Sequence, residues 1–223
     1  MSGITQEARG GRVRVKICGL TKQRDAEESV ALGADALGFN TWMGSKRYLD
    51  LAQARHWVRR LPPFVSKVAL LVNASLEEAR KIAELPGIDV LQLHGDEDEA
   101  YCARLAAWEI PFIKALRLRS ADDVQDLDRF STDHILVDAH VEGLFGGTGV
   151  RVDLSLAALI KEKYPQMALL LAGGLRPENV EDAVRLVRPY AVDVSSGVES
   201  APGVKDYALL RGFVEAVHRG AVS

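Results

Sequence analysis

A cysteine stands at the carboxyl end of the first strand that the sequence predicts, within residues 13–19. Because successive side chains of a strand point to opposite faces, Arg14, Lys16 and Cys18 share one face. A thiol beside a lysine could act in proton transfer, since a nearby cation favours the reactive thiolate. A buried structural cysteine is equally consistent with the residue type, because free cysteines are often buried.

Polar side chains also stand where later strands are expected to end. Gln92 and His94 end the fourth strand, Asp138 the sixth and Asp193 the eighth. Alternation predicts that one inward-facing set includes Lys16, Cys18, Gln92, Lys114, Asp138 and Asp193. A thiol and a carboxylate at converging strand ends are candidate proton-transfer groups. A satisfied polar network in the core is the alternative.

Two short loops of small residues could bind an anion. Gly173 and Gly174 follow the seventh strand, and Ser195, Ser196 and Gly197 follow the eighth. Such loops let backbone N–H groups close on a phosphate, helped by a helix N-terminus. Plain turn chemistry is the alternative, since turns use glycine constantly.

Two further loops carry weaker signals. Residues 40–48 combine aromatic side chains with Lys46 and Arg47. An arginine beside aromatic rings suits an aromatic carboxylate, through ion pairing and stacking; a solvated basic loop is the alternative. The glycine-rich residues 143–149 could form a lid over a ligand or an ordinary surface loop.

Composition excludes several classes of function. The net charge of −3 gives no general attraction to nucleic acid or to an anionic membrane, and no apolar stretch is long enough to span a bilayer. The five histidines show no metal-ligand spacing, and no dinucleotide-binding fingerprint occurs, so we expect no metal and no cofactor. Two cysteines outside any CxxC spacing suit a reducing cytoplasm.

Strand and helix patterns alternate along the 223 residues, which suit one large α/β domain. The predicted strands are Val13–Cys18, Ala36–Phe39, Lys67–Val72, Val90–Leu93, Phe112–Leu116, His134–Asp138, Ala168–Leu171 and Tyr190–Val194. The predicted helices are Lys22–Leu32, Leu51–Arg60, Ser75–Leu85, Asp96–Ala107, Ser120–Leu127, Leu154–Tyr164, Pro177–Val187 and Val204–His218. Thr21 and Asp96 are the expected caps of the first and fourth helices.

Eight units of roughly 26 residues predict a single (β/α)8 TIM barrel over residues 13–223, after a disordered lead-in of residues 1–12. A doubly wound open sheet is the main alternative. The site of such a barrel lies at the carboxyl ends of its strands, and the loops after strands seven and eight usually bind phosphate. The residues therefore predict a cofactor-free isomerase, epimerase or lyase that acts on a sugar phosphate.

The motifs resemble those of the phosphoribosylanthranilate isomerases of tryptophan biosynthesis. They are Lys16-Ile17-Cys18-Gly19-Leu20-Thr21, Gly44-Ser45-Lys46-Arg47-Tyr48, Leu91-Gln92-Leu93-His94-Gly95, Val137-Asp138-Ala139, Gly146-Gly147-Thr148-Gly149, Leu171-Ala172-Gly173-Gly174-Leu175 and Asp193-Val194-Ser195-Ser196-Gly197-Val198-Glu199. The resemblance covers almost the whole chain from Val13 onward.

This resemblance implies an Amadori rearrangement of N-(5-phosphoribosyl)anthranilate to 1-(2-carboxyphenylamino)-1-deoxyribulose 5-phosphate. By analogy Asp138 is the general acid, Cys18 is the general base and Arg47 holds the anthranilate carboxylate. Gln92, His94 and Asp193 would contact the substrate, while Gly173, Gly174, Ser195, Ser196 and Gly197 would hold its phosphate. Another sugar-phosphate isomerase or epimerase, or a non-catalytic phosphate-binding barrel, is the alternative. The expected oligomeric state is a monomer or a homodimer.

Overall fold

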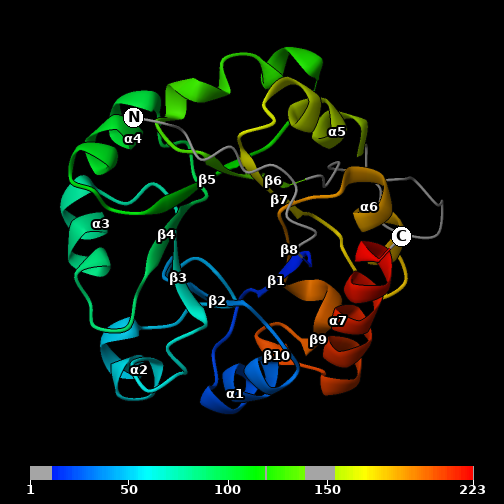
Figure 1. Ribbon diagram of the computed structural model, residues 1–223. Coiled ribbons are helices and arrows are strands. Elements are labelled where there is room, and N and C mark those ends of the chain that lie inside the picture. Colours follow the sequence, from blue (N-terminus) through cyan, green and yellow to red (C-terminus); the bar gives the residue numbers. More distant parts are fainter. Residues whose placement is uncertain (1–11, 119, 139–153, 223) are drawn as a thin grey trace.

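Eight parallel strands form a closed ring at the centre of the computed structural model, which describes residues 12–118, 120–138 and 154–222 (Figure 1). The strands follow one another around the ring in chain order, and β1 pairs with β8 to close it. They are β1 (Arg14–Ile17), β2 (Ala36–Asn40), β3 (Ser66–Leu71), β4 (Val90–Leu93), β5 (Phe112–Leu116), β6 (His134–Asp138), β7 (Ala168–Ala172) and β8 (Ala191–Val194). The predicted (β/α)8 barrel is therefore confirmed, and the open-sheet alternative is wrong.

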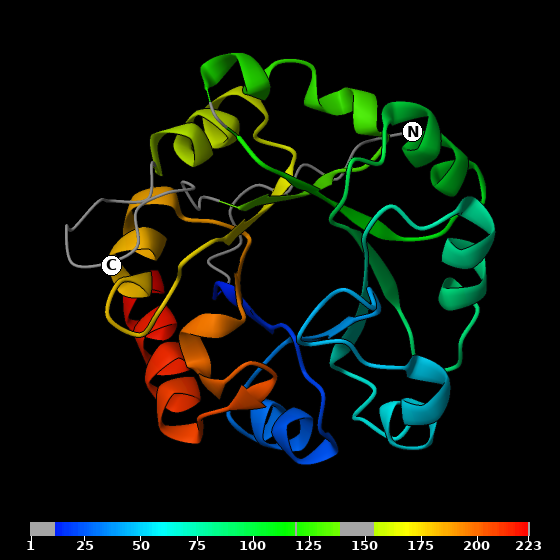
Figure 2. The same ribbon diagram turned by 180° about the vertical axis from the view of Figure 1, so that it is seen from behind.

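Helices surround this ring on the outside, as the view from behind also shows (Figure 2). They are α1 (Gln23–Ala31), α2 (Leu51–Val58), α3 (Leu76–Ala83), α4 (Glu99–Ala107), α5 (Leu154–Lys163), α6 (Val180–Val187) and α7 (Tyr207–Ala221). The capping box expected at the start of α3 is present, with Ser75 and Glu78 each bonding the other's backbone N–H. Within the described ranges, no helix is long and apolar enough to cross a membrane.

Strand alternation divides the core into two layers. Val15, Ile17 and their counterparts on other strands pack outward against the helices, whereas Ile113, Ala115 and Leu136 fill the barrel interior. Full burial of each large apolar side chain contributes about 1.5–3 kcal/mol, so both layers stabilise the ring.

Lys114 lies on the outer side of β5, contrary to the prediction that it faces inward. Its neighbours Ile113 and Ala115 belong to the interior cluster, so alternation turns Lys114 toward the helices. There its Nζ pairs with Glu97 at 2.8 Å, and both side chains are almost fully buried. Lys114 therefore stabilises the turn after β4.

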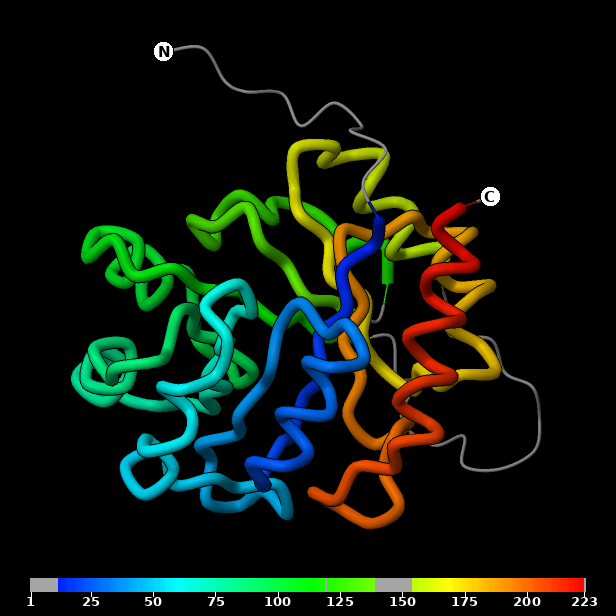
Figure 3. Tube along the Cα trace, turned by 60° about the horizontal axis from the view of Figure 1, so that its bottom comes forward, coloured from blue at the N-terminus to red at the C-terminus, as the bar shows by residue number. Residues whose placement is uncertain are grey.

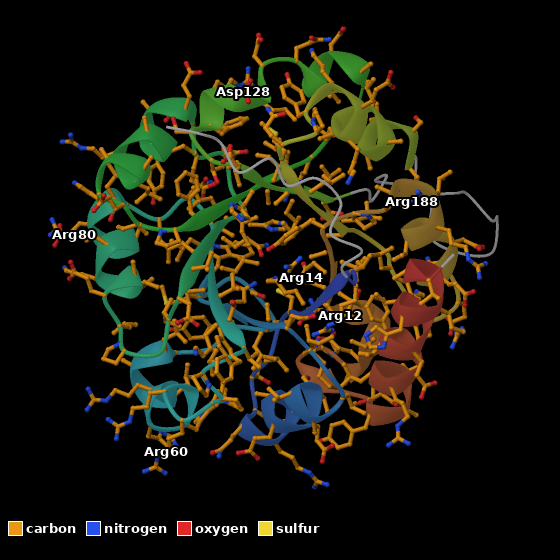
Figure 4. The ribbon with its side chains drawn as sticks, viewed as in Figure 1. Arg12, Arg14, Arg60, Arg80, Asp128 and Arg188 are labelled. Carbon is orange, nitrogen blue, oxygen red and sulfur yellow. The ribbon has the colours of Figure 1, made fainter. Side chains whose placement is uncertain are left out.

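Arg14 marks the opposite end of the barrel from the strand ends that carry the candidate site. Its guanidinium stacks over the ring of Tyr190 at 4.1 Å. Arg12 and Arg14 lie near the middle of the ring in Figure 4, whereas Arg60, Arg80 and Arg188 lie at its rim. Sharing a strand face with Lys16 and Cys18 therefore does not bring Arg14 into the site.

The helix predicted over Ser120–Leu127 is replaced by two 3-10 turns, η1 (Ala121–Val124) and η2 (Leu127–Phe130). The expected start is present, because Ser120 and Asp123 form a capping box. Asp126 then adopts a left-handed conformation (φ 55°), which no α-helix can continue through. The connection from β5 to β6 is therefore made without an α-helix.

Three helices begin later than predicted. Asp98, not Asp96, caps α4 by accepting a bond from the backbone N–H of Tyr101. Lys22 occupies the cap position of α1, where the structure shows no side-chain cap, and Thr21 instead donates to the carbonyl of Gly203. Helix α6 begins at Val180, because Asn179 bonds back to Gly174 and Arg176 and holds residues 177–179 in a turn.

The last predicted helix, Val204–His218, is also wrong at its start. A short turn η3 (Ser196–Val198) and an antiparallel hairpin of β9 (Glu199–Ala201) and β10 (Val204–Lys205) come first, and α7 begins at Tyr207. Asp206 caps α7 through the backbone N–H groups of Ala208 and Leu209. The hairpin lies near the lower end of the molecule in Figure 3, and its Lys205 contacts the carbonyl of Cys18, directly after β1.

The proposed lid at residues 143–149 lies outside the described residues, as does the expected lead-in except for Arg12.

Candidate active site

Lys16 and Asp193 form a buried ion pair inside the barrel. They are direct neighbours on β1 and β8, and Lys16 Nζ lies 2.6 Å from Asp193 Oδ1. Burial opposes the charge of Lys16, but Asp193 and Cys18 outweigh it and raise the pKa of the lysine. Lys16 is therefore a fixed cation at neutral pH.

Cys18 lies beside this pair, with 5% of its surface exposed. Its Sγ and the Nζ of Lys16 lie 2.8 and 3.1 Å, respectively, from the point where a Cβ on Gly38 would stand. Burial raises the pKa of the Cys18 thiol, and the opposing effect of Lys16 is smaller. The Asp193 carboxylate also raises the Cys18 pKa, so it offsets part of the effect of Lys16.

Gln92 and His94 continue the site across the barrel at the end of β4. The Gln92 side chain is fully buried and its Nε2 lies 2.9 Å from Nδ1 of His94. Gln92 Oε1 has no hydrogen-bond partner among the described residues, so it remains available to a ligand donor. Burial lowers the pKa of His94, which keeps its imidazole neutral near pH 7.

Asp138 ends β6 on the inward-facing side of that strand, in line with interior Leu136. With His94 it lines a cavity of about 690 Å³ over the carboxyl ends of β4, β5 and β6. Asp138 and Asp193 both act electrostatically on His94, as does Lys16. The inward-facing groups of β1, β4, β6 and β8 thus converge at one end of the barrel.

The two glycine-rich loops meet as expected. Gly173 and Gly174 adopt positive φ angles of 88° and 60° after β7. Gly197, in the turn after β8, packs so closely on this loop that an added Cβ would stand 1.9 Å from the Leu175 carbonyl oxygen. Ser195 Oγ is buried with no hydrogen-bond partner in the described part of the chain. The two loops therefore form one continuous edge beside the strand ends.

Arg47 reaches this edge from the loop after β2. Its side chain crosses Gly19, where a Cβ would stand 2.4 Å from Arg47 Cδ and 2.7 Å from Ser195 Oγ. Gly19 has a positive φ of 73°, so glycine suits both the turn and the close approach. Glu199 accepts from Nε and Nη2 of Arg47 in a bidentate ion pair. Arg47 is therefore anchored beside Cys18, whereas Trp42, Lys46 and Tyr48 of the same loop are exposed.

Sequence reasoning missed the roles of Glu199 and Lys205, which lie in the unpredicted hairpin. Lys205 is buried and bonds to Glu199 and to the backbone carbonyls of Cys18 and Ser195. The one signal for Glu199 was its place at the end of the Asp193–Glu199 motif that carries the family resemblance. Lys205 gave no comparable signal, since the helical pattern assigned to residues 204–218 concealed it.

A closed (β/α)8 barrel that gathers ionisable side chains at the carboxyl ends of its strands has the architecture of a barrel enzyme. The family model of N-(5'-phosphoribosyl)anthranilate isomerase matches residues 15–216. The chain therefore belongs to the N-(5'-phosphoribosyl)anthranilate isomerase family. Membership makes it an isomerase of the intramolecular oxidoreductase class.

Individual relatives agree with this assignment. The chain is 47% identical over 207 residues to the N-(5'-phosphoribosyl)anthranilate isomerase of Pseudomonas fluorescens, covering 92% of this chain and 98% of the relative. That of Neisseria meningitidis is 44% identical over 211 residues, covering 93% and 98%. The crystal structure of the Thermotoga maritima isomerase superposes with a TM-score of 0.82 at 40% identity, covering 92% and 98%.

A second solved structure carries a ligand. It is a phosphoribosylanthranilate isomerase in complex with reduced 1-(o-carboxyphenylamino)-1-deoxyribulose 5-phosphate, with a TM-score of 0.78 and 38% identity. The alignment covers 92% of this chain and 98% of that one. The barrel fold and the family resemblance expected from the sequence are confirmed.

Proposed function

We propose that this enzyme catalyses the Amadori rearrangement of N-(5-phosphoribosyl)anthranilate with Asp138 as general acid and Cys18 as general base. Asp138 donates a proton to the ribose ring oxygen, and the C1–O bond breaks to give a protonated Schiff base. Cys18 removes the proton from C2. The electron pair of the C2–H bond forms a C1–C2 double bond, and the C=N electrons neutralise the iminium nitrogen to give an enolamine. Tautomerisation to the ketone yields 1-(2-carboxyphenylamino)-1-deoxyribulose 5-phosphate, a step of tryptophan biosynthesis.

The observation that carries this proposal is the placement of one thiol and one carboxylate on inward-facing ends of different strands. Cys18 directly follows β1 and Asp138 ends β6, and these two strands lie on separate sides of the ring (Figure 1). An acid and a base on two sides of a sugar can act on different atoms of it without neutralising each other. A site that only binds a phosphate needs neither group.

The remaining polar groups suit the rest of this substrate. We assign the phosphate to the loops of Gly173, Gly174, Ser195, Ser196 and Gly197, whose backbone and unpartnered Ser195 Oγ offer donors. Arg47 would hold the anthranilate carboxylate. Gln92, neutral His94 and Asp193 would contact the ribose hydroxyls, for which the unpartnered Gln92 Oε1 is an acceptor.

A fluorescence assay that follows the loss of N-(5-phosphoribosyl)anthranilate tests the function directly. We expect turnover by the wild-type enzyme and strongly reduced turnover by Asp138→Asn. Binding of the substrate without any turnover by the wild-type protein would instead identify a phosphate-binding barrel that has no catalytic role.

The pH profile tests the state of Cys18. Because burial raises the thiol pKa and the base must be a thiolate, we expect kcat/KM to rise with pH on a limb whose midpoint lies above about 8.5, the ordinary thiol value. Measurement of kcat/KM between about pH 6.5 and 9.5 checks this. Cys102→Ala is the matched control, since that buried thiol on α4 lies away from the site. A profile that is flat through the neutral range contradicts the proposed state of Cys18.

Gly197→Ala tests the proposed phosphate site. The new Cβ would overlap the carbonyl oxygen of Leu175, so the two loops must separate. Misplaced phosphate donors should raise KM at least about tenfold. Gly212→Ala is the control, because a Cβ there meets nothing closer than Pro177 Cβ at 3.6 Å. An unchanged KM in a Gly197→Ala protein of normal thermal stability would place the phosphate elsewhere.

We further propose that the enzyme works in the cytoplasm, as a monomer or a homodimer and without nucleic-acid partners. Both cysteines are free and buried, which suits a reducing compartment. Among its relatives, a Thermotoga maritima structure is described as monomers of a dimeric enzyme. Sedimentation at several concentrations distinguishes the two states for this chain.

A further inference from the structure

The β9–β10 hairpin brings two charged residues into the site. Glu199 opens β9 and Lys205 closes β10, and their carboxylate and ammonium lie 2.9 Å apart. The side chains are only 4% and 0% exposed. Burying two charges in this way is costly unless every donor and acceptor is used, so their partners indicate what the hairpin does.

Lys205 Nζ has three acceptors, which match its three donors. It donates to the backbone carbonyl of Cys18 at 2.6 Å, to that of Ser195 at 3.2 Å and to Glu199 Oε1 at 2.9 Å. Two of these acceptors lie at the ends of β1 and β8, where the proposed base and phosphate loop begin. Lys205 therefore ties Glu199 to the backbone that carries both groups.

Glu199 in turn fixes the position of the Arg47 side chain. Its carboxylate receives Arg47 Nε at 2.9 and 3.1 Å and Nη2 at 2.6 Å. Burial works against the charge of Glu199, but the hydrogen bonds from Arg47 and Lys205 outweigh it and lower its pKa. The ion pair between Arg47 and Glu199 is therefore charged on both sides at neutral pH. A bidentate arginine–carboxylate pair has one preferred orientation.

The same contact leaves one side of the guanidinium open. Arg47 Nη1 has no hydrogen bond within the described residues, and a quarter of the Arg47 side chain is exposed, against 4% of Glu199. Contact with Gly19 fixes the methylene part of the side chain. The free N–H groups thus point away from Glu199, where a second carboxylate could approach.

We propose that Glu199, held by Lys205, is a positioning residue that orients Arg47 for the aromatic carboxylate of the substrate. This inference rests on the proposed function, and it explains how the enzyme recognises the aromatic carboxylate of the substrate. Glu199 does not touch the substrate. Its charge limits Arg47 to one rotamer, so the enzyme pays little ordering entropy when the carboxylate arrives. Recognition of the carboxylate is therefore lost when Glu199 is neutral, although Arg47 is still present.

Two substrates separate this role from a structural one. N-(5-phosphoribosyl)anthranilate carries the carboxylate, and N-(5-phosphoribosyl)aniline has the same sugar phosphate without it. For Glu199→Gln we expect kcat/KM to fall at least about tenfold with the anthranilate substrate, mainly through KM, and less than about threefold with the aniline substrate. Equal losses on both substrates, or no loss on either, would overturn the proposal.

A double-mutant cycle tests whether Glu199 acts through Arg47. Arg47→Gln should reduce kcat/KM on the anthranilate substrate, and adding Glu199→Gln should lower it by less than about twofold more. Additive losses would overturn the proposal. If Glu199→Gln fails to fold, Glu199→Asp takes its place. Aspartate keeps the negative charge beside Lys205, but its shorter side chain cannot reach Arg47 in the same bidentate geometry. The same selective loss of kcat/KM on the anthranilate substrate is expected. Loss on both substrates in that variant also overturns it.

Glu181→Gln is the matched control. Glu181, on α6, also pairs with two arginines, Arg185 and Arg219, but on the outer surface. We expect no change with either substrate. Failure of the wild-type enzyme on both substrates would reject the proposed function itself, whereas a wild-type enzyme that turns over the anthranilate substrate leaves the role of Glu199 to be decided by the variants.

Discussion

Cys18→Ser should lower kcat by at least about a hundredfold, because a general base contributes 10²–10⁴ in rate and a serine hydroxyl is far less acidic than a thiol. The serine hydroxyl gives up its proton far less readily than the Cys18 thiol, so far less of it is present in the ionised form that could accept the proton from C2 of the Schiff base. The loss should appear in kcat, since the loops proposed to bind the phosphate and the carboxylate are untouched. Single-turnover and steady-state measurements of substrate fluorescence check this.

The control is Cys102→Ser, which makes the same chemical change at a buried cysteine on α4. Burial raises the pKa of that thiol to about 11, and its removal should leave kcat within about twofold of the wild-type value. Circular dichroism should show folded protein for both variants. A Cys18→Ser enzyme of near-normal turnover would remove Cys18 from the mechanism.

Asp138→Asn should cost a similar factor of at least about a hundred in kcat. The side chains have nearly the same shape, but an amide cannot give a proton to the departing ring oxygen, so the ribose ring stays closed. Binding should survive, because the proposed phosphate and carboxylate sites lie on other strands. Turnover and equilibrium binding of N-(5-phosphoribosyl)anthranilate, measured side by side, separate the two effects.

Asp133→Asn makes the same change just before the start of β6, at the opposite end of that strand. Its backbone carbonyl, which the substitution keeps, bonds the N–H of Ala168. We expect wild-type kinetics from this control. An Asp138→Asn enzyme whose kcat falls by less than about threefold would show that another group supplies the proton.

The sequence was sufficient for the barrel because its signals are local and repeated. Apolar strands such as Val90–Leu93 and Phe112–Leu116 were bounded correctly, since turn residues flank each run. Alternation also gave the inward direction of Lys16, Gln92 and Asp193, all of which are buried. The same rule, applied to Lys114 without counting its neighbours, gave the wrong face.

The errors arose where tertiary contacts override local preference. Val204 and Lys205 continue a helical pattern in the sequence. In the structure, however, Lys205 donates hydrogen bonds to the carbonyls of Cys18 and Ser195, which lie far away in the chain. The helical and strand periodicity of a sequence cannot predict a contact of this kind. The pairing of Arg47 with Glu199, which spans 152 positions, is equally invisible to local patterns. Candidate site residues could therefore be proposed from the sequence, whereas the ion pairs among them could not.

The closure of the ring by β1 and β8 links enzyme activity to the order of folding. Lys16 meets Asp193 across that seam, and Lys205 reaches the Cys18 carbonyl over a separation of 187 positions. Contacts between residues so far apart carry a large loop-closure cost and form late. A growing chain on the ribosome therefore has no assembled site until nearly its whole length has emerged. Recovery of turnover after dilution from denaturant reports the completion of the barrel, while helix content reports only its earlier parts.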